Sequence, residues 1–123
     1  MNSYDIDLLK HELNKISSTL GIIGCALVER NGLAITSELP RTINEKTLGA
    51  MTATMFEAME SAVPDKEKKV ANLTVEYEDY EIFITKVNDQ VLFIGLIEYN
   101  IDLGLILIEI EEFIGKISHF LEN

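Results

Sequence analysis

"TLGAMTATMFEAMESA", residues 47–62, lies in a predicted helix, and these sixteen residues carry only two charges, Glu57 and Glu60. One quarter of the whole chain is charged, and a helix with one face in water normally places Lys, Glu or Gln on that face. At about 100° per residue, the helix forms an apolar stripe wide enough to cover a sheet. This stripe contains Leu48, Met51, Met55, Met59 and Ala62. The architecture therefore depends on what covers the other side of this helix.

Small residues stand beside the stripe, at positions where the surface of a monomer would normally be charged. Gly49 and Ala53 are four residues apart, and Ala50 lies further round the helix. One interpretation is that a helix from a second copy of the chain approaches closely at Gly49 and Ala53. The alternative is that these two residues only avoid a clash with a loop.

The rest of the chain predicts three helices and five strands in the order α-β-β-α-β-β-β-α. Helical spacing indicates a first helix, Thr42 with Glu45 fits a capping box for the second, and Pro64 is expected to end the second. The last segment starts with "LILIEI", which resembles a strand, but its later period favours a helix. We expect helices at about 5–19 and 42–63 and a last helix within residues 100–123, with clear helical spacing from Ile110 to Leu121, and strands at 22–29, 33–37, 69–77, 80–87 and 91–98.

Two of these strands, 22–29 and 91–98, are apolar at odd and even positions alike. Such strands are covered on both faces, so helices must pack on both sides of one sheet. The predicted fold is a five-stranded antiparallel sheet of the α+β type, with these two strands at its centre and helices on both faces.

The stretch "ANLTVEY", residues 71–77, predicts a strand that could pair with a second copy of itself if it lies at an edge of that sheet. No proline or bulge-forming glycine protects its edge, so antiparallel pairing with its own twin would satisfy the open backbone groups. Dimerisation would then extend one sheet across two subunits and bring the two second helices together. The expected dimer interface contains Gly49, Ala50, Ala53, Phe56, Ala71, Leu73, Val75 and Tyr77.

Composition limits the class of protein. The chain has 123 residues and a mass of 13.8 kDa, which predicts one domain over residues 1–123. Its net charge of −11 disfavours nucleic acid and anionic lipid as partners and favours a protein with a basic face. The apolar runs are too short for direct membrane insertion, and the single cysteine suits a reducing, cytoplasmic location.

Residues that carry common chemistry do not cluster in the sequence. His11 and His119 have no other ligand-type residues at metal-binding spacing, and Cys25 lies in a strand that we expect to be buried. We therefore predict no metal, no cofactor and no catalytic residue.

Four consecutive segments over nearly the whole chain carry a family resemblance. They are "GIIGCALVERNGLAITSELP", "LGAMTATMFEAMESA", "LTVEYEDYEIFITKVNDQVLFIGL" and "NIDLGLILIEIEEFIGKI". Together they resemble the roadblock domain of dynein light chains and MglB-like regulators. The resemblance implies a five-stranded antiparallel sheet with the second helix on one face and the terminal helices on the other. It also implies homodimers, or heterodimers with a related roadblock chain, and a Ras-like small GTPase as partner.

The resulting hypothesis is a non-enzymatic dimeric regulator or scaffold for a Ras-like small GTPase, with Arg41, Glu57 and Glu60 as partner-binding residues. Only Arg30 and Arg41 are available as a transition-state arginine, and an arginine beside a turn is usually solvated surface. One alternative is a structural adaptor that recruits a motor or membrane-associated complex without GTPase contact. A small-ligand sensor is another alternative, but no convergent polar cluster supports it.

Overall fold

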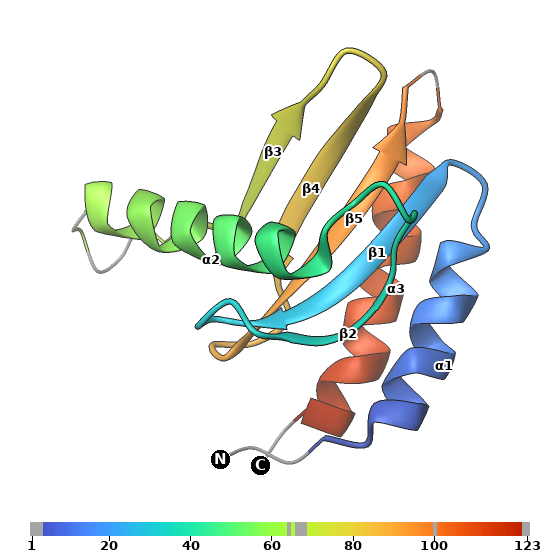
Figure 1. Cartoon of the computed structure of the whole chain (residues 1–123), viewed down its shortest axis with the longest axis horizontal. Helices are drawn as coiled ribbons and strands as arrows, with labels where there is room; N and C mark the ends of the chain where they lie inside the picture. The colour runs from blue at the N-terminus through green and yellow to red at the C-terminus, as the bar shows by residue number, and fades with distance from the viewer. Residues whose placement is uncertain (1–3, 64, 66–68, 100, 122–123) are drawn as a thin grey trace.

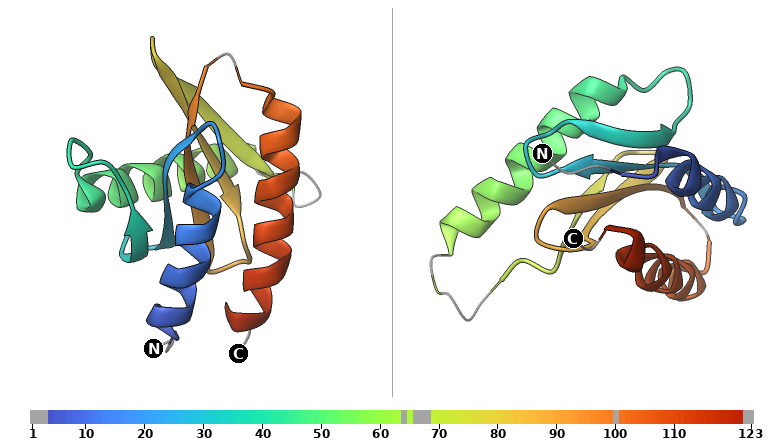
Figure 2. Two further views of the ribbon diagram at one scale, coloured as in Figure 1. Left: turned by 90° about the vertical axis from the view of Figure 1, so that its right-hand side faces the viewer. Right: turned by 90° about the horizontal axis from the view of Figure 1, so that it is seen from below.

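The computed structural model describes residues 4–63, 65, 69–99 and 101–121. A five-stranded antiparallel sheet with the strand order β2-β1-β5-β4-β3 lies between two layers of helices (Figures 1 and 2). The helices are α1 (Ile6–Ser17), α2 (Glu45–Ala62) and α3 (Leu103–Leu121), and the strands are β1 (Ile22–Glu29), β2 (Ala34–Glu38), β3 (Asn72–Glu76), β4 (Tyr80–Lys86) and β5 (Val91–Glu98). The predicted fold and element order are confirmed, including the helical assignment of the last segment.

The start of α2 differs from the prediction. Asn44 is the N-cap, and its side-chain oxygen accepts a hydrogen bond from the Thr47 amide at 3.0 Å. The predicted cap at Thr42 is wrong, because the Ile43 amide donates to the Pro40 carbonyl and closes a turn ahead of the helix. Pro64, the expected end of this helix, lies outside the described residues.

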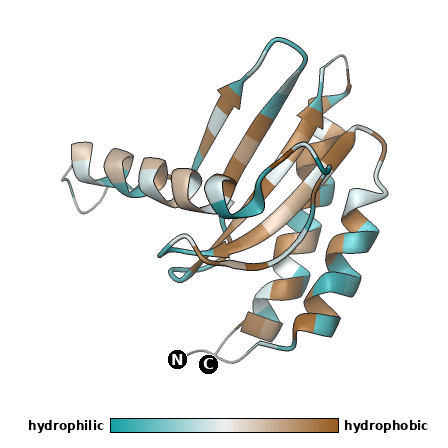
Figure 3. Ribbon diagram, in the orientation of Figure 1, coloured by the Kyte–Doolittle hydropathy of each residue, from teal (hydrophilic) through white to brown (hydrophobic). Residues whose placement is uncertain are grey.

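Two apolar layers hold the sheet. The central strands β1 and β5 contribute to both and are mostly hydrophobic along their length (Figure 3), and every β5 residue from Val91 to Ile97 is buried. On one face, α1 and α3 pack with their buried residues Leu9, Leu13, Ile16, Ile106, Ile110, Phe113, Ile117 and Leu121. The other face is covered by α2, which crosses the sheet alone (Figure 2).

The rotation of α2 about its axis is the main departure from the sequence analysis. Phe56 is fully buried against the sheet, and Gly49, Thr52 and Ala53 share its face. Met51 and Met59 are 54% and 46% exposed, so the predicted apolar stripe is not centred on the sheet, although its members Leu48 and Met55 pack at the margin of the core. The placement of Gly49 and Ala53 on a side turned away from the sheet is therefore wrong.

Close contact with the β1–β2 turn explains this rotation. A Cβ atom at Gly49 would lie 2.6 Å from the Gly32 carbonyl oxygen and 3.3 Å from Val28 Cγ1. Gly32 itself has a φ of 94°, a conformation that favours glycine. The interpretation of Gly49 as a residue that avoids a loop is thus the correct one. Only small residues on this side of α2 allow the helix to approach the hairpin.

We predict that Gly49→Ala destabilises the protein by about 2 kcal/mol, because overpacking outweighs the gain in helix propensity. The matched control is Gly115→Ala on α3, where a new Cβ would have no neighbour within 4 Å. That variant should gain about 0.5–1 kcal/mol. Urea unfolding of both variants measures the difference. A Gly49→Ala variant as stable as Gly115→Ala would contradict the observed packing of α2.

Candidate functional site

The outer face of α2 carries no charge from Ala50 to Ala62. We use this name for Ala50, Met51, Thr54, Ala58, Ser61 and Ala62, all of which are exposed. Glu57 lies beside this face, and Glu60 is turned further toward the sheet. The shortage of charge noted in the sequence is therefore real, but it belongs to these residues and not to Gly49 and Ala53.

Strand β3 forms an open edge of the sheet, with β4 as its neighbour on the other side. The Tyr77 amide donates to the Tyr80 carbonyl at 2.8 Å, which fixes the alternation of bonded and non-bonded pairs along the hairpin. By this alternation, the backbone groups of Asn72, Thr74 and Glu76 point away from β4. They are free to pair with a further strand.

The residues predicted for a dimer interface divide into two groups. Gly49, Ala53 and Phe56 are buried in the core of the chain itself and hold α2 in place. The other five reach the surface to different degrees: Ala50, Ala71 and Tyr77 are exposed, whereas Leu73 and Val75 are half-buried.

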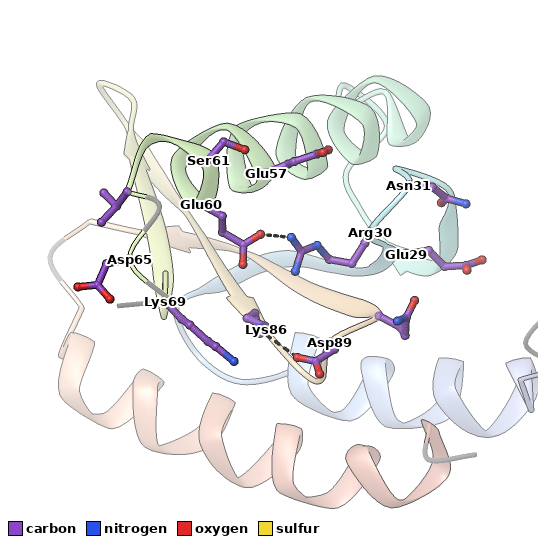
Figure 4. A pocket seen from close by; sticks show the side chains of 12 residues that line it. Glu29, Arg30, Asn31, Glu57, Glu60, Ser61, Asp65, Lys69, Lys86 and Asp89 are labelled. Carbon is purple, nitrogen blue, oxygen red and sulfur yellow. Dashed lines mark hydrogen bonds and ion pairs between the residues drawn. The ribbon is translucent and has the colours of Figure 1, made fainter. Parts of the chain in front are cut away.

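A groove of about 1020 Å³ lies beside the C-terminal half of α2 (Figure 4). Its walls come from α2, the β1–β2 turn, the β4–β5 turn and the chain that follows α2. Carboxylates outnumber cations in its lining, which contains Glu29, Glu57, Glu60, Asp65 and Asp89 with Arg30, Lys69 and Lys86. Turns that are far apart in the sequence meet here, so the sequence alone did not reveal this group.

Arg30, which follows β1, contacts both α2 and the β4–β5 turn at the groove. Its guanidinium forms an ion pair with Glu60 and lies 5.1 Å from the centre of the Phe56 ring. Its amide donates to the Gln90 carbonyl at 3.0 Å. Figure 4 shows Arg30 directed at Glu60, so this arginine is engaged within its own chain.

The other charges of the groove are less constrained. Lys86 pairs with Asp89 at 3.4 Å, whereas Glu29 and Glu57 have no ion pair within the described part of the chain. Free carboxylates at the rim suit a basic side chain of a protein partner. Of the predicted partner-binding residues, Glu57 and Glu60 line this groove. Arg41 is exposed in the turn before α2, at the other end of the helix.

The cysteine Cys25 is buried in the core and does not reach this surface. Burial raises the pKa of the Cys25 thiol to about 12, with a further contribution from Glu38. Its Sγ donates to the Leu13 carbonyl, so Cys25 is a core residue, as predicted. Over the described ranges, no group of three or more His, Cys, Asp or Glu side chains is placed to hold a metal ion.

Comparison with known proteins assigns the class. An antiparallel sheet with one crossing helix on one face and two terminal helices on the other is the roadblock architecture. Residues 9–96 match the Roadblock/LC7 domain, so the chain belongs to this family. Two proteins of Methanocaldococcus jannaschii, both described as uncharacterized, are 31% identical to it over 114 residues, covering 92% of this chain and 96% of each relative.

Solved structures share the fold at low sequence identity. Myxococcus xanthus MglB superposes with a TM-score of 0.88 at 18% identity, covering 97% of this chain and 91% of that chain. A structure described as MglB with tetrameric arrangement gives a TM-score of 0.83 at 10% identity, covering 98% of this chain and 93% of that chain. None of the described helices has the length and apolarity needed to cross a membrane.

We predict that Glu60→Gln destabilises the protein by about 1 kcal/mol, because the partly buried Arg30 loses its ionised partner. Glu57→Gln removes the same charge from the same helix without breaking an ion pair found in the structure, and it should change stability by less than about 0.5 kcal/mol. Thermal and urea unfolding measure both. Equal losses of stability in the two variants would show that the ion pair of Arg30 with Glu60 does not stabilise the packing of α2.

Proposed function

We propose that this protein is a non-enzymatic dimeric regulator or scaffold that binds a Ras-like small GTPase. The observation that carries the proposal is the uncharged outer face of α2 on the same side of the sheet as the apolar residues of the open β3 edge. Both features are unusual on the surface of a monomer. Roadblock family membership implies a small GTPase as the partner class. The cytoplasm is the proposed location, which fits a single, buried cysteine.

The dimer would form by antiparallel pairing of two β3 edges and packing of two α2 outer faces. Ala50, Thr54 and Ala58 are short enough for two helices to approach closely, and Met51 adapts its shape to an apolar neighbour. Ala71, Leu73, Val75 and Tyr77 would then meet their counterparts on the twin strand. A related roadblock chain that presents the same surface would serve equally well as the second subunit.

The GTPase contact would follow from this pairing. Two α2 helices side by side create a continuous platform with the acidic groove at its ends, and Glu57 stands at the rim of each groove. A partner with basic residues around its nucleotide site complements that charge. Since Arg30 is engaged by Glu60, the proposed action is to position groups of the GTPase itself, and not to supply an arginine. Arg41 remains a predicted contact at the other end of α2.

We expect Ala58→Arg to convert the dimer into a monomer, because a charged side chain would stand at the centre of the paired outer faces. The dimer dissociation constant should rise by about a hundredfold or more. Asn14→Arg, on the exposed side of α1, is the matched control and should stay dimeric. Light scattering and sedimentation measure molar mass. A wild-type monomer, or a dimeric Ala58→Arg variant, would rule out this interface.

GTPase binding is tested by calorimetry with candidate small GTPases of the same organism, loaded with GDP or with a non-hydrolysable GTP analogue. We expect binding in at least one nucleotide state, and we expect Glu57→Lys to weaken it about tenfold through charge repulsion. Absence of binding in both states would contradict the proposal. A stable partner that crosslinks equally in either state and is not a GTPase would favour the adaptor alternative.

A further inference from the structure

A second apolar surface lies on the opposite side of the sheet from α2. Leu20 is 83% exposed, and Leu105 and Ile108 of α3 are 62% and 52% exposed. These are high exposed fractions for aliphatic side chains. They surround the place where the chain leaves α1 and where α3 begins.

Unequal helix lengths explain why this surface is open. α1 has 12 residues and α3 has 19, and the two run antiparallel. Figure 2 shows the first turns of α3 continuing past the end of α1. Leu105 and Ile108 belong to these turns, so no neighbouring helix covers them. Leu20 lies in the turn after α1, just before Gly21, where a Cβ atom would lie 2.7 Å from side-chain atoms of Ile101 and Ile106.

A shallow groove of about 190 Å³ between α1 and α3 continues this surface. Its wall on α1 is held by the buried Glu12, which pairs with Lys116 at 3.0 Å and with Lys15 at 3.6 Å. Burial alone would raise the pKa of Glu12, but Lys116, Lys15 and His11 outweigh it and lower the pKa, so the carboxylate is charged. This contact keeps the groove in a fixed shape.

Acidic residues surround the exposed aliphatic residues. Glu109 and Glu112 line the groove, and Glu111 stands on the outer side of α3. None of the three forms an ion pair with any residue that the structure describes. The nearby cations Lys15 and Lys116 are both directed at Glu12. The surface therefore combines free negative charge with solvent-exposed leucine and isoleucine.

We propose that this α1–α3 surface, made of Leu20, Leu105, Ile108, Glu109 and Glu112, binds a basic amphipathic helix of a protein partner. A helix lying along the groove would extend the two-helix layer to three, with its apolar side on the leucines and its lysines or arginines on the glutamates. The glutamates repel an anionic membrane surface, which argues against lipid as the occupant. The proposal does not require a GTPase on the α2 side.

The test uses a fluorescent 18-residue helical peptide with leucine on one face and lysine on the other, and a control peptide with glutamate in place of lysine. Fluorescence anisotropy with the full chain should give binding at least about tenfold tighter for the basic peptide. Leu105→Ser/Ile108→Ser should abolish this binding. Leu33→Ser, which removes an exposed apolar residue at the β1–β2 turn, should leave it unchanged.

A matched pair of charge reversals separates a local site from general attraction to an acidic protein. Glu109→Lys/Glu112→Lys and Glu78→Lys/Asp79→Lys change the net charge equally, but the second pair lies at the β3–β4 turn. We expect the affinity for the basic peptide to fall at least about tenfold in Glu109→Lys/Glu112→Lys and less than about twofold in Glu78→Lys/Asp79→Lys. Equal losses would overturn the proposal. The proposal would also be overturned if Leu105→Ser/Ile108→Ser still bound the basic peptide, or if the protein bound anionic vesicles in preference to the peptide. A lower molar mass of Leu105→Ser/Ile108→Ser than of the wild type would overturn it as well, because the surface would then be an interface between copies of the chain.

Discussion

The contact between Gly49 of α2 and Gly32 of the β1–β2 turn determines which surface this protein presents. The two backbones approach so closely that a Cβ at Gly49 would lie 2.6 Å from the Gly32 carbonyl oxygen. Because α2 lies this close to the hairpin, Thr52, Ala53 and Phe56 fill the space beneath it, and Met51 and Met59 turn outward. The ion pair of Arg30 with Glu60 then holds the other half of the helix. The uncharged outer face is thus a consequence of tight packing on the inner face.

Sequence patterns were sufficient to predict an element where a strand is buried on both faces or where helical periodicity extends over many residues. Apolar residues at odd and even positions placed β1 and β5 at the centre of the sheet, and the period after Ile110 identified α3 as a helix. The rotation of α2 about its axis could not be predicted from the sequence pattern in the same way. Leucine and methionine look more suitable for a core than glycine, alanine and threonine, but hydropathy contains no information on the distance between a helix and a sheet. That distance depends on the Gly32 turn, which is a tertiary contact.

The candidate site was predictable only in part, for a related reason. Glu57 and Glu60 could be selected because they are the only charges in the stretch from Thr47 to Ala62. Lys86 and Asp89 belong to a turn that is distant in sequence and reaches the groove only after β4 and β5 are paired. The engagement of Arg30 by Glu60 and Phe56 also depends on the folded position of α2. The spacing of residues along the sequence identifies candidate side chains, whereas the residues that these side chains contact depend on the topology of the fold.

The two open surfaces require separate explanations because the sheet lies between them. Pairing of α2 with α2 and of β3 with β3 would bury residues on one side and at one edge of the sheet, whereas Leu20, Leu105 and Ile108 lie against the layer on the other side. A dimer built through α2 and β3 leaves both of its α1–α3 layers facing outward. Exposed aliphatic residues there are not accounted for by dimerisation through α2 and β3 or by a GTPase on the α2 platform. A scaffold that holds one partner at its centre and another on each flank is consistent with both surfaces.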